Sequence, residues 1–149
     1  MLFRTPMVAL VLKLLIVLKI GTQYVSSCTV QYKGCAGTSM DTLPSAFTTN
    51  FLPACSKLDI CYSCGNTKKW LREECDKRFL HDMHRICRTT YRKWYEKTTR
   101  ANCKAYAKTY YKLVSVTGRK YYDKVSPKWC TKDCVVSKGS PDIKYQENL

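Results

Sequence analysis

Ten cysteines, all between residues 28 and 134 of a 149-residue chain, constrain the fold more than any other feature. An even number of cysteines in so short a segment is typical of a secreted domain that is stapled by disulfides, because such pairing needs an oxidising compartment. Zinc ligation is the alternative, since Cys61-Tyr-Ser-Cys64 is a C-x-x-C motif, but no second motif follows at finger spacing. Ten cysteines allow on the order of 900 pairings, so the connectivity stays open.

The N-terminus predicts secretion. Arg4 precedes a mainly apolar run from Met7 to Ile20, which is the pattern of a secretory signal peptide. A membrane anchor is the alternative, but Lys13 and Lys19 interrupt the run, and each lysine inside a bilayer would cost roughly 2.5–3.5 kcal/mol. We therefore expect an extracellular product. The predicted organisation is a signal peptide over residues 1–27, a domain over residues 28–137 and a polar tail over residues 138–149.

Apolar residues recur at three- and four-residue spacings through most of the chain beyond residue 50, whereas strand patterns are weak. The expected class is therefore mainly α, after a loop-rich segment over residues 28–44. Gly65-Asn66 and Gly118 are the expected helix stops. The predicted helices run from Phe51 or Pro53 to Cys64, from Lys69 to about Thr98 with a break near Thr89-Thr90, and from about Ala101 to Thr117.

The formal net charge of the chain is +15, of which +12 remains after the three cations of the predicted signal peptide are removed. The excess lies between Lys68 and Lys132, where basic residues outnumber acidic ones about three to one. A field of this size attracts anionic surfaces, either lipid or nucleic acid. In a secreted chain we favour lipid and expect no nucleic acid. Binding to heparin is a third class that the charge allows, although no motif supports it.

A group of residues with chemical potential lies on two of the predicted helices. One side of the first helix carries Cys55, Tyr62 and either Leu58 or Asp59. Relative to Cys55 these residues lie at i+7 (Tyr62), i+3 (Leu58) and i+4 (Asp59), which are spacings that share a helix side. Asp76 follows a cysteine early in the next helix. If the two helices pack antiparallel, Asp76 faces the first helix near Leu58 and Tyr62. A buried tyrosine hydroxyl needs a partner, and an aspartate is a suitable one.

The stretch Cys55-Ser-Lys-Leu58-Asp59-Ile-Cys61-Tyr62 resembles the helix motif C-x-x-H-D-x-C-Y of secreted phospholipases A2. The wider context has P-A-C before the motif, C-G after it and C-D-x-x-F-L-x-D-M downstream, and it is similar to the conodipine group of marine invertebrates. The resemblance covers nearly all of the expected mature chain. It implies a mainly α, disulfide-rich phospholipase A2-like fold with two antiparallel core helices and a loop-rich N-terminal calcium-loop region, and it implies a venom or secretory role.

In that family a helix histidine activates water, a facing aspartate orients the histidine, and calcium polarises the ester carbonyl. The resemblance implies that Asp76 is the orienting aspartate and that Tyr62 is its hydrogen-bond partner. It implies Asp59 and Asp41 as calcium ligands. Leu58 occupies the histidine position, and leucine cannot accept a proton. We therefore expect a catalytically inactive protein. The alternative is an active calcium-dependent phospholipase A2 that hydrolyses the sn-2 ester by a rearranged base.

Two histidines remain as replacements for the missing base, His81 and His84. Both lie at least one turn beyond Asp76, and eight residues of helix separate Asp76 from His84, about 12 Å of rise. We expect them to be surface or helix-packing residues rather than catalytic ones.

The segment after the predicted break mixes aromatic and basic side chains in a way that resembles an interfacial membrane anchor. Helix packing in the core is the alternative, because i, i+3 and i+4 spacing also serves a core. The expected partner is a phospholipid membrane surface or an extracellular receptor, and the oligomeric state is not predicted. Arg119-Lys120 follows a glycine and is either a convertase cleavage site or an ordinary basic helix end. The candidate membrane-binding residues are Tyr91, Arg92, Lys93, Trp94 and Tyr95.

Overall fold

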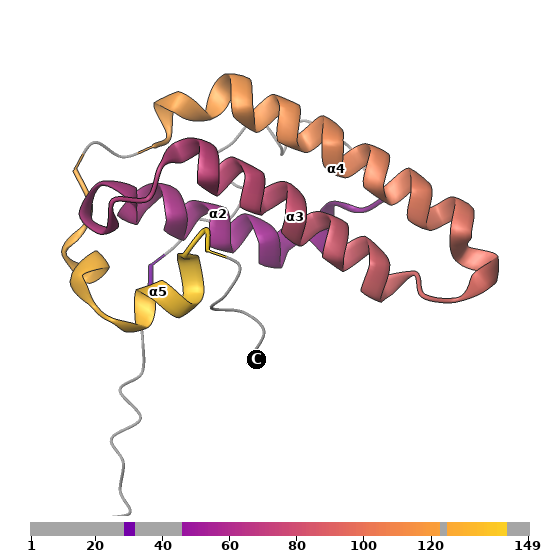
Figure 1. Cartoon of the computed structure of the whole chain (residues 1–149), viewed down its shortest axis with the longest axis horizontal. Coiled ribbons are helices and arrows are strands. Elements are labelled where there is room, and N and C mark those ends of the chain that lie inside the picture. The colour runs from indigo at the N-terminus through magenta and orange to yellow at the C-terminus, as the bar shows by residue number, and fades with distance from the viewer. Residues whose placement is uncertain (1–28, 32–45, 123–124, 143–149) are drawn as a thin grey trace, which may run out of the picture.

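The computed structural model describes residues 29–31, 46–122 and 125–142, and in these ranges it contains helices and no strand (Figure 1). The prediction of a mainly α chain is therefore confirmed. Short 3-10 helices follow or precede the longer elements at Trp94–Glu96 (η3), Gly118–Lys120 (η4) and Lys128–Thr131 (η5). The α-helices are α2 (Thr48–Lys68), α3 (Arg72–Thr90), α4 (Lys97–Thr117) and α5 (Cys134–Gly139).

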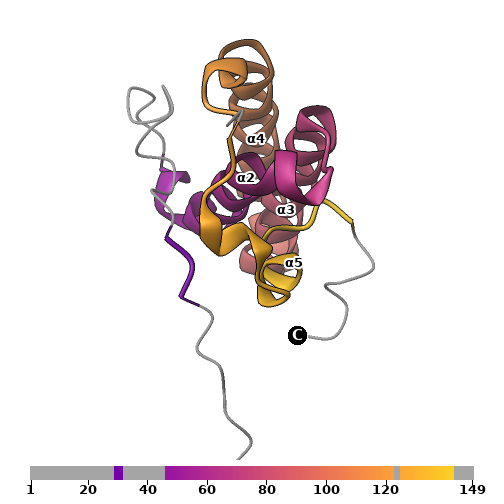
Figure 2. The ribbon, with the colours of Figure 1, turned by 90° about the vertical axis from the view of Figure 1, so that its left-hand side faces the viewer.

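Helices α2, α3 and α4 pack side by side, and α5 packs on the side of α2 away from α4 (Figures 1 and 2). The α2–α3 pair is antiparallel, since the Cys61–Cys75 disulfide and the Lys57–Asp82 ion pair join residues in opposite order along the two helices. The expected antiparallel packing is confirmed. The connecting turn is formed by residues 69–71.

The first helix is longer at both ends than its sequence suggests. It begins at Thr48, includes Pro53 in its interior and ends only at Lys68, where Lys69 adopts a left-handed conformation with φ 60°. The predicted stop at Gly65-Asn66 is wrong. Gly65 is required for packing, because a Cβ atom at this position would lie 2.5 Å from Cε2 of Tyr122. A close approach of another chain segment therefore explains a glycine that resembles a helix terminator.

The second predicted stop, Gly118, is also needed for packing. Its φ of −67° is helical and the chain continues into η4, while a Cβ atom at Gly118 would collide with the hydroxyl of Tyr62. Arg119 and Lys120 are exposed on η4, and nothing in the structure tests whether the chain is cleaved there.

The break predicted near Thr89-Thr90 is confirmed, because α3 ends at Thr90. The chain then turns through residues 91–93 into η3, and α4 begins at Lys97 instead of Ala101. The predicted continuation of the second helix to Thr98 is therefore wrong. The end of α4 at Thr117 agrees with the prediction.

Disulfides join the helices to one another, as the cysteine count predicts. Cys61 pairs with Cys75 between α2 and α3, and this pairing excludes the zinc alternative for the C-x-x-C motif, since Cys64 is also paired. Cys55 and Cys134 are disulfide-bonded too, and no cysteine in the described part of the chain is free. The two further pairs between described residues are Cys64–Cys130, from α2 to η5, and Cys87–Cys103, from α3 to α4.

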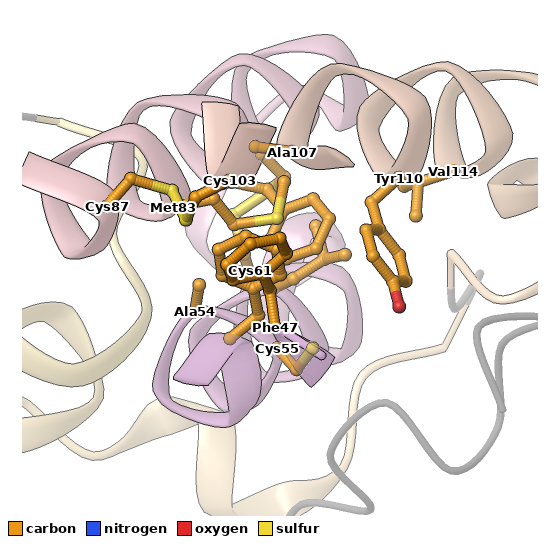
Figure 3. Close-up of a cluster of buried hydrophobic side chains, with 14 of the residues drawn as sticks. Phe47, Ala54, Cys55, Cys61, Met83, Cys87, Cys103, Ala107, Tyr110 and Val114 are labelled. Carbon is orange, nitrogen blue, oxygen red and sulfur yellow. A yellow bond between two sulfur atoms is a disulfide. The ribbon is translucent and has the colours of Figure 1, made fainter. Parts of the chain in front are cut away.

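The core lies between the three long helices (Figure 3). Phe51, Phe79 and Met83 are almost completely buried there, next to the Cys87–Cys103 disulfide. A second, smaller cluster joins α5 to α2. Because Gly139 and Ser140 are buried against α2, the packed part of the chain extends beyond residue 138, where the polar tail is expected to begin. The smaller cluster consists of Ile60, Cys64, Cys130 and Val135.

No helix in the described ranges is long and apolar enough to span a bilayer. The choice between a signal peptide and an anchor concerns residues 1–27, which lie outside those ranges.

Candidate functional site

Helices α2 and α3 bring Tyr62 and Asp76 together. Both side chains are buried, and the Tyr62 hydroxyl donates a hydrogen bond to Asp76 Oδ1. The preceding residues, Cys61 and Cys75, are joined by a disulfide, which holds the two helices together at the same level. The structure therefore contains the hydrogen bond that the sequence predicts between these two residues.

Arg72 completes the surroundings of the carboxylate. Its Nη1 atom lies 3.1 Å from Asp76 Oδ2 and 3.2 Å from the carbonyl oxygen of Ser115 on α4. The Arg72 guanidinium therefore makes one contact within α3 and one hydrogen bond from α3 to α4. Sequence reasoning missed Arg72, although its i, i+4 spacing from Asp76 is a recognised ion-pair signal on a helix.

Burial sets the electrostatics of this group. Desolvation raises the pKa of Asp76, while the hydrogen bond from Tyr62 and the charge of Arg72 act in the opposite direction. Burial also raises the pKa of Tyr62, and the hydrogen bond to Asp76 adds to this effect. The tyrosine therefore stays protonated as a donor. Both oxygens of Asp76 have a partner, so the arrangement can hold a neighbouring side chain in place but offers no free base.

Leu58 lies one turn before Tyr62 on α2 and is buried. It lines a small cavity whose walls come from α2, α3 and the end of α5. Its hydrocarbon side chain neither donates nor accepts a hydrogen bond, so this part of the cavity wall is chemically inert. The residues that line the cavity are Ala54, Lys57, Leu58, Cys61, Cys75, Arg78, Phe79, Asp82, Gly139 and Ser140.

Neither histidine interacts with Asp76 among the described hydrogen bonds and ion pairs. Nδ1 of His81 lies 3.8 Å from Asp82 Oδ1, and the side chain is 40% exposed. His84 faces α4, where burial lowers its pKa and the charges of Lys104 and Lys108 lower it further. Both positions agree with the expected surface or helix-packing role.

Asp82 is the charged centre of the cavity wall. It is buried, and Oδ2 accepts a hydrogen bond of 3.0 Å from Nε of Arg78. Lys57 Nζ lies 3.8 Å from the same oxygen, and Arg85 Nη2 lies 3.9 Å from Oδ1. A buried carboxylate surrounded by cations is a structural ion-pair centre. Sequence reasoning attached no role to Lys57, since its partner lies on a different helix.

The predicted calcium ligands are Asp59 and Asp41. Calcium takes six to eight oxygen ligands, whereas no group of three or more candidate ligand residues is present in the described ranges. Asp59 is half-buried on α2. Asp41, its predicted partner in metal binding, lies outside those ranges.

The structure divides the predicted membrane-binding set into two parts. Tyr91 packs against Phe47, and its hydroxyl accepts a hydrogen bond of 3.0 Å from Nδ2 of Asn50. In contrast, Trp94 is 86% exposed and Tyr95 is 60% exposed, which excludes core packing for these two residues.

The exposed pair Trp94 and Tyr95 lies in η3, in the connection between α3 and α4. The two rings contact each other edge to face with centroids 5.8 Å apart, and Lys93 Nζ lies 5.5 Å from the Tyr95 ring centroid. Arg92 and Lys93 are exposed beside them. This combination of amphipathic rings and cations at the end of a helical hairpin is suited to contact with a lipid headgroup layer.

Comparison with known proteins relates the chain to a phospholipase A2 family and to conodipines. A family model described as prokaryotic phospholipase A2 matches residues 19–118. Conodipine-P3 of Conus purpurascens is 44% identical over 62 residues, which are 42% of this chain and 33% of that protein. The Conodipine-M alpha chain of Conus magus is 40% identical over 37 residues, which are 25% of this chain and 48% of that chain.

The matched segments therefore span less than half the length of these curated relatives. No solved structure matches the chain.

Proposed function

The chain belongs to the prokaryotic phospholipase A2 family, and from this membership we propose that it is a secreted phospholipase A2-like protein that binds its target without hydrolysing esters. The single observation that carries the proposal is Leu58. It is buried one turn before Tyr62, and the resemblance of the surrounding stretch to the C-x-x-H-D-x-C-Y motif supports its assignment to the position of the water-activating histidine. General-base assistance is typically worth about 10²–10⁴-fold in rate, and leucine supplies none of it.

No neighbouring side chain supports a replacement base. His81 is associated with Asp82, and His84 lies against α4. Asp76 itself accepts hydrogen bonds from Tyr62 and Arg72, so its oxygens are engaged in holding the helices together. In this proposal the Tyr62–Asp76 pair is kept as part of the scaffold rather than as catalytic machinery.

The retained pair also favours a second candidate function, an active phospholipase A2 that cleaves the sn-2 ester of phospholipids. The hydrogen bond between Tyr62 and Asp76 would orient a histidine if one stood at residue 58. An active native protein would have to activate water by another group.

The proposed target is a phospholipid membrane surface, with an extracellular receptor as the other class of partner. The exposed Trp94 and Tyr95 with the adjacent cations support membrane contact. The disulfides support an extracellular location, because they persist in oxidising compartments.

Calcium remains part of the proposal through Asp59 and Asp41. If calcium is bound there, it supplies positive charge that attracts a phosphate group or an ester carbonyl oxygen. Asp59 offers a half-buried carboxylate for this purpose. The proposal of an inactive protein does not depend on the metal, since it rests on the missing base.

The test is hydrolysis of phospholipid vesicles by the purified protein in the presence of calcium. We expect no fatty-acid release above background from the native protein or from Leu58→Gln, a polar control of similar size. Leu58→His is expected to gain release that a chelator abolishes. Chelator-sensitive hydrolysis by the native protein would establish the active alternative instead. A folded but inactive Leu58→His variant would contradict the assignment of Leu58 to the base position.

A further inference from the structure

Helix α4 carries five cations in a single row. They follow one another at spacings of three or four residues, so they share one side of the helix, and the row is about 22 Å long at 1.5 Å per residue. The helix contains no aspartate or glutamate from Lys97 to Thr117. The α4 basic row consists of Lys97, Arg100, Lys104, Lys108 and Lys112.

The row lies beside the contact between α4 and α3 and is open to solvent. Lys97, Lys108 and Lys112 are exposed, and Arg100 and Lys104 are half-buried. The charges of Lys104 and Lys108 act on His84 of α3, which places them at the α3 side of the helix. The adjoining side of α4 is buried in the core through Cys103, Ala107, Tyr110 and Val114.

No counter-charge within the described part of the molecule neutralises the α4 basic row, because none of the ion pairs found there includes a member of it. The acidic residues Asp76 and Asp82 are buried and pair with cations of α2 and α3. Like charges three or four residues apart destabilise a helix. Arg100 donates a hydrogen bond of 2.7 Å from Nη1 to the carbonyl oxygen of Tyr91. The four lysines of the row have no partner among the described ion pairs, so an external anion would stabilise them.

The neighbouring positions indicate which kind of anion fits. Ala101, Ala105 and Thr109 each follow a member of the row, and all three are small and exposed. A surface that inserts into a membrane carries large apolar side chains beside its cations. In this chain Trp94 and Tyr95 have those properties and precede α4, and Val116 is exposed one turn beyond Lys112, so these side chains lie at the two ends of the row. A single line of cations between them matches a polymer that presents anionic groups along its length.

We propose that the α4 basic row binds a linear sulfated polysaccharide, the class represented by heparin. Sulfate groups along such a chain would meet the lysines on successive helical turns. Disulfide formation takes place in compartments and extracellular spaces where this class of polyanion is a more usual partner than nucleic acid. The inference is independent of the proposed loss of esterase activity, because it uses no residue of the Leu58 cavity.

The test compares two triple variants of the full chain with equal loss of charge. The row variant carries Lys104→Gln, Lys108→Gln and Lys112→Gln. The matched control replaces three exposed lysines near the C-terminal end, Lys128, Lys132 and Lys138, with glutamine. Heparin oligosaccharide affinity is measured by titration calorimetry over a range of salt concentrations. Thermal unfolding verifies that all three proteins are folded, as we expect for substitutions of solvent-accessible side chains.

We expect the row variant to bind heparin at least about tenfold more weakly, with a shallower salt dependence, and the control to lose no more than about threefold. Equal losses in the two variants, or an unchanged row variant, would overturn the proposal. Single-stranded DNA and vesicles with anionic lipid are tested in parallel. Tighter binding of DNA than of heparin would overturn the assignment of the partner. Loss of vesicle binding alone in the row variant would indicate that the row contacts membranes.

Discussion

Tyr62 on α2 donates a hydrogen bond to Asp76 on α3, and each residue directly follows one half of the Cys61–Cys75 disulfide. A covalent link and a buried polar link thus fix the same point of contact between the two helices. Because both side chains are buried, the hydrogen bond matters for stability as well as for any chemistry that the pair could support.

Tyr62→Phe is expected to destabilise the fold by about 1–3 kcal/mol, because it leaves a buried oxygen of Asp76 without its donor. Urea unfolding followed by circular dichroism measures the change. Tyr95→Phe is the matched control, since Tyr95 is exposed, and it should alter stability by less than about 0.5 kcal/mol. Equal effects of the two substitutions would contradict a role for the buried hydrogen bond.

Gly65→Ala is expected to destabilise the protein by about 1–3 kcal/mol through overpacking. The sign of this stability change is informative, because alanine in place of glycine inside an unconstrained helix would stabilise the helix by roughly 0.8–1.0 kcal/mol. The new methyl group would collide with the ring of Tyr122, whose hydroxyl donates a hydrogen bond of 2.6 Å to the carbonyl oxygen of Trp70.

A double-mutant cycle checks this explanation. In a Tyr122→Ala background the ring is absent, and Gly65→Ala should then have a much smaller cost or a stabilising effect. Unchanged destabilisation in that background would show that Tyr122 is not the group that excludes a side chain at residue 65.

Stability should decrease as the pH falls below about 6.5, the ordinary pKa of histidine, through the titration of His84. Burial and nearby cations lower the pKa of His84 in the folded state, so the unfolded chain binds the proton first. Neutral His84 contributes fully to the free energy of unfolding at pH values above its pKa in the unfolded chain. This contribution is lost as the pH falls to its lower pKa in the folded protein. Unfolding free energies of the native protein and His84→Gln should therefore converge or cross on acidification. Parallel curves for the two proteins would contradict the assignment.

Replacement of both Trp94 and Tyr95 by alanine should reduce binding to vesicles that contain anionic lipid by about tenfold or more, while leaving thermal stability unchanged. Vesicle co-sedimentation measures the partition. Val125→Ala is the control for an exposed apolar side chain at another place, since Val125 is 84% exposed. If the control lowers binding as much as the double variant, the aromatic pair is not the membrane contact.

Calcium binding is expected to require Asp59 and Asp41. Titration calorimetry of the native protein should show heat of binding, and Asp59→Asn or Asp41→Asn should weaken the affinity by about tenfold, since each removes a charged oxygen ligand. Asp133→Asn serves as the control because Asp133 is an exposed carboxylate on a different segment. Native-like affinity in Asp59→Asn would exclude this residue as a ligand.

Much of the helical framework follows from local patterns. The spacing of apolar residues locates three long helices, and the threonine pair at residues 89 and 90 marks the end of the second. The helix ends were less predictable. Gly65 and Gly118 resemble terminators, but both are small because a tyrosine from elsewhere packs against them, and such a contact between distant segments leaves no local signal.

The candidate site shows the same division. Tyr62 and Asp76 could be paired from the sequence, because helical spacing, antiparallel packing of the two helices and the family resemblance all predict that they face each other. Tyr91 is partly buried and packs against the core, whereas Trp94 is exposed, and the sequence could not predict this difference. Helical spacing states which residues share a side of a helix, but it does not state whether another element covers that side.

The sequence by itself therefore determined the helical class and the disulfide-stapled character, because these depend on residue identity and on near-neighbour spacing. Only the tertiary structure decided which cysteines pair, which carboxylates are enclosed by cations and which cations remain in an open row on α4. Those outcomes depend on how helices pack against one another, since burial and charge pairing arise between residues that are distant in the chain.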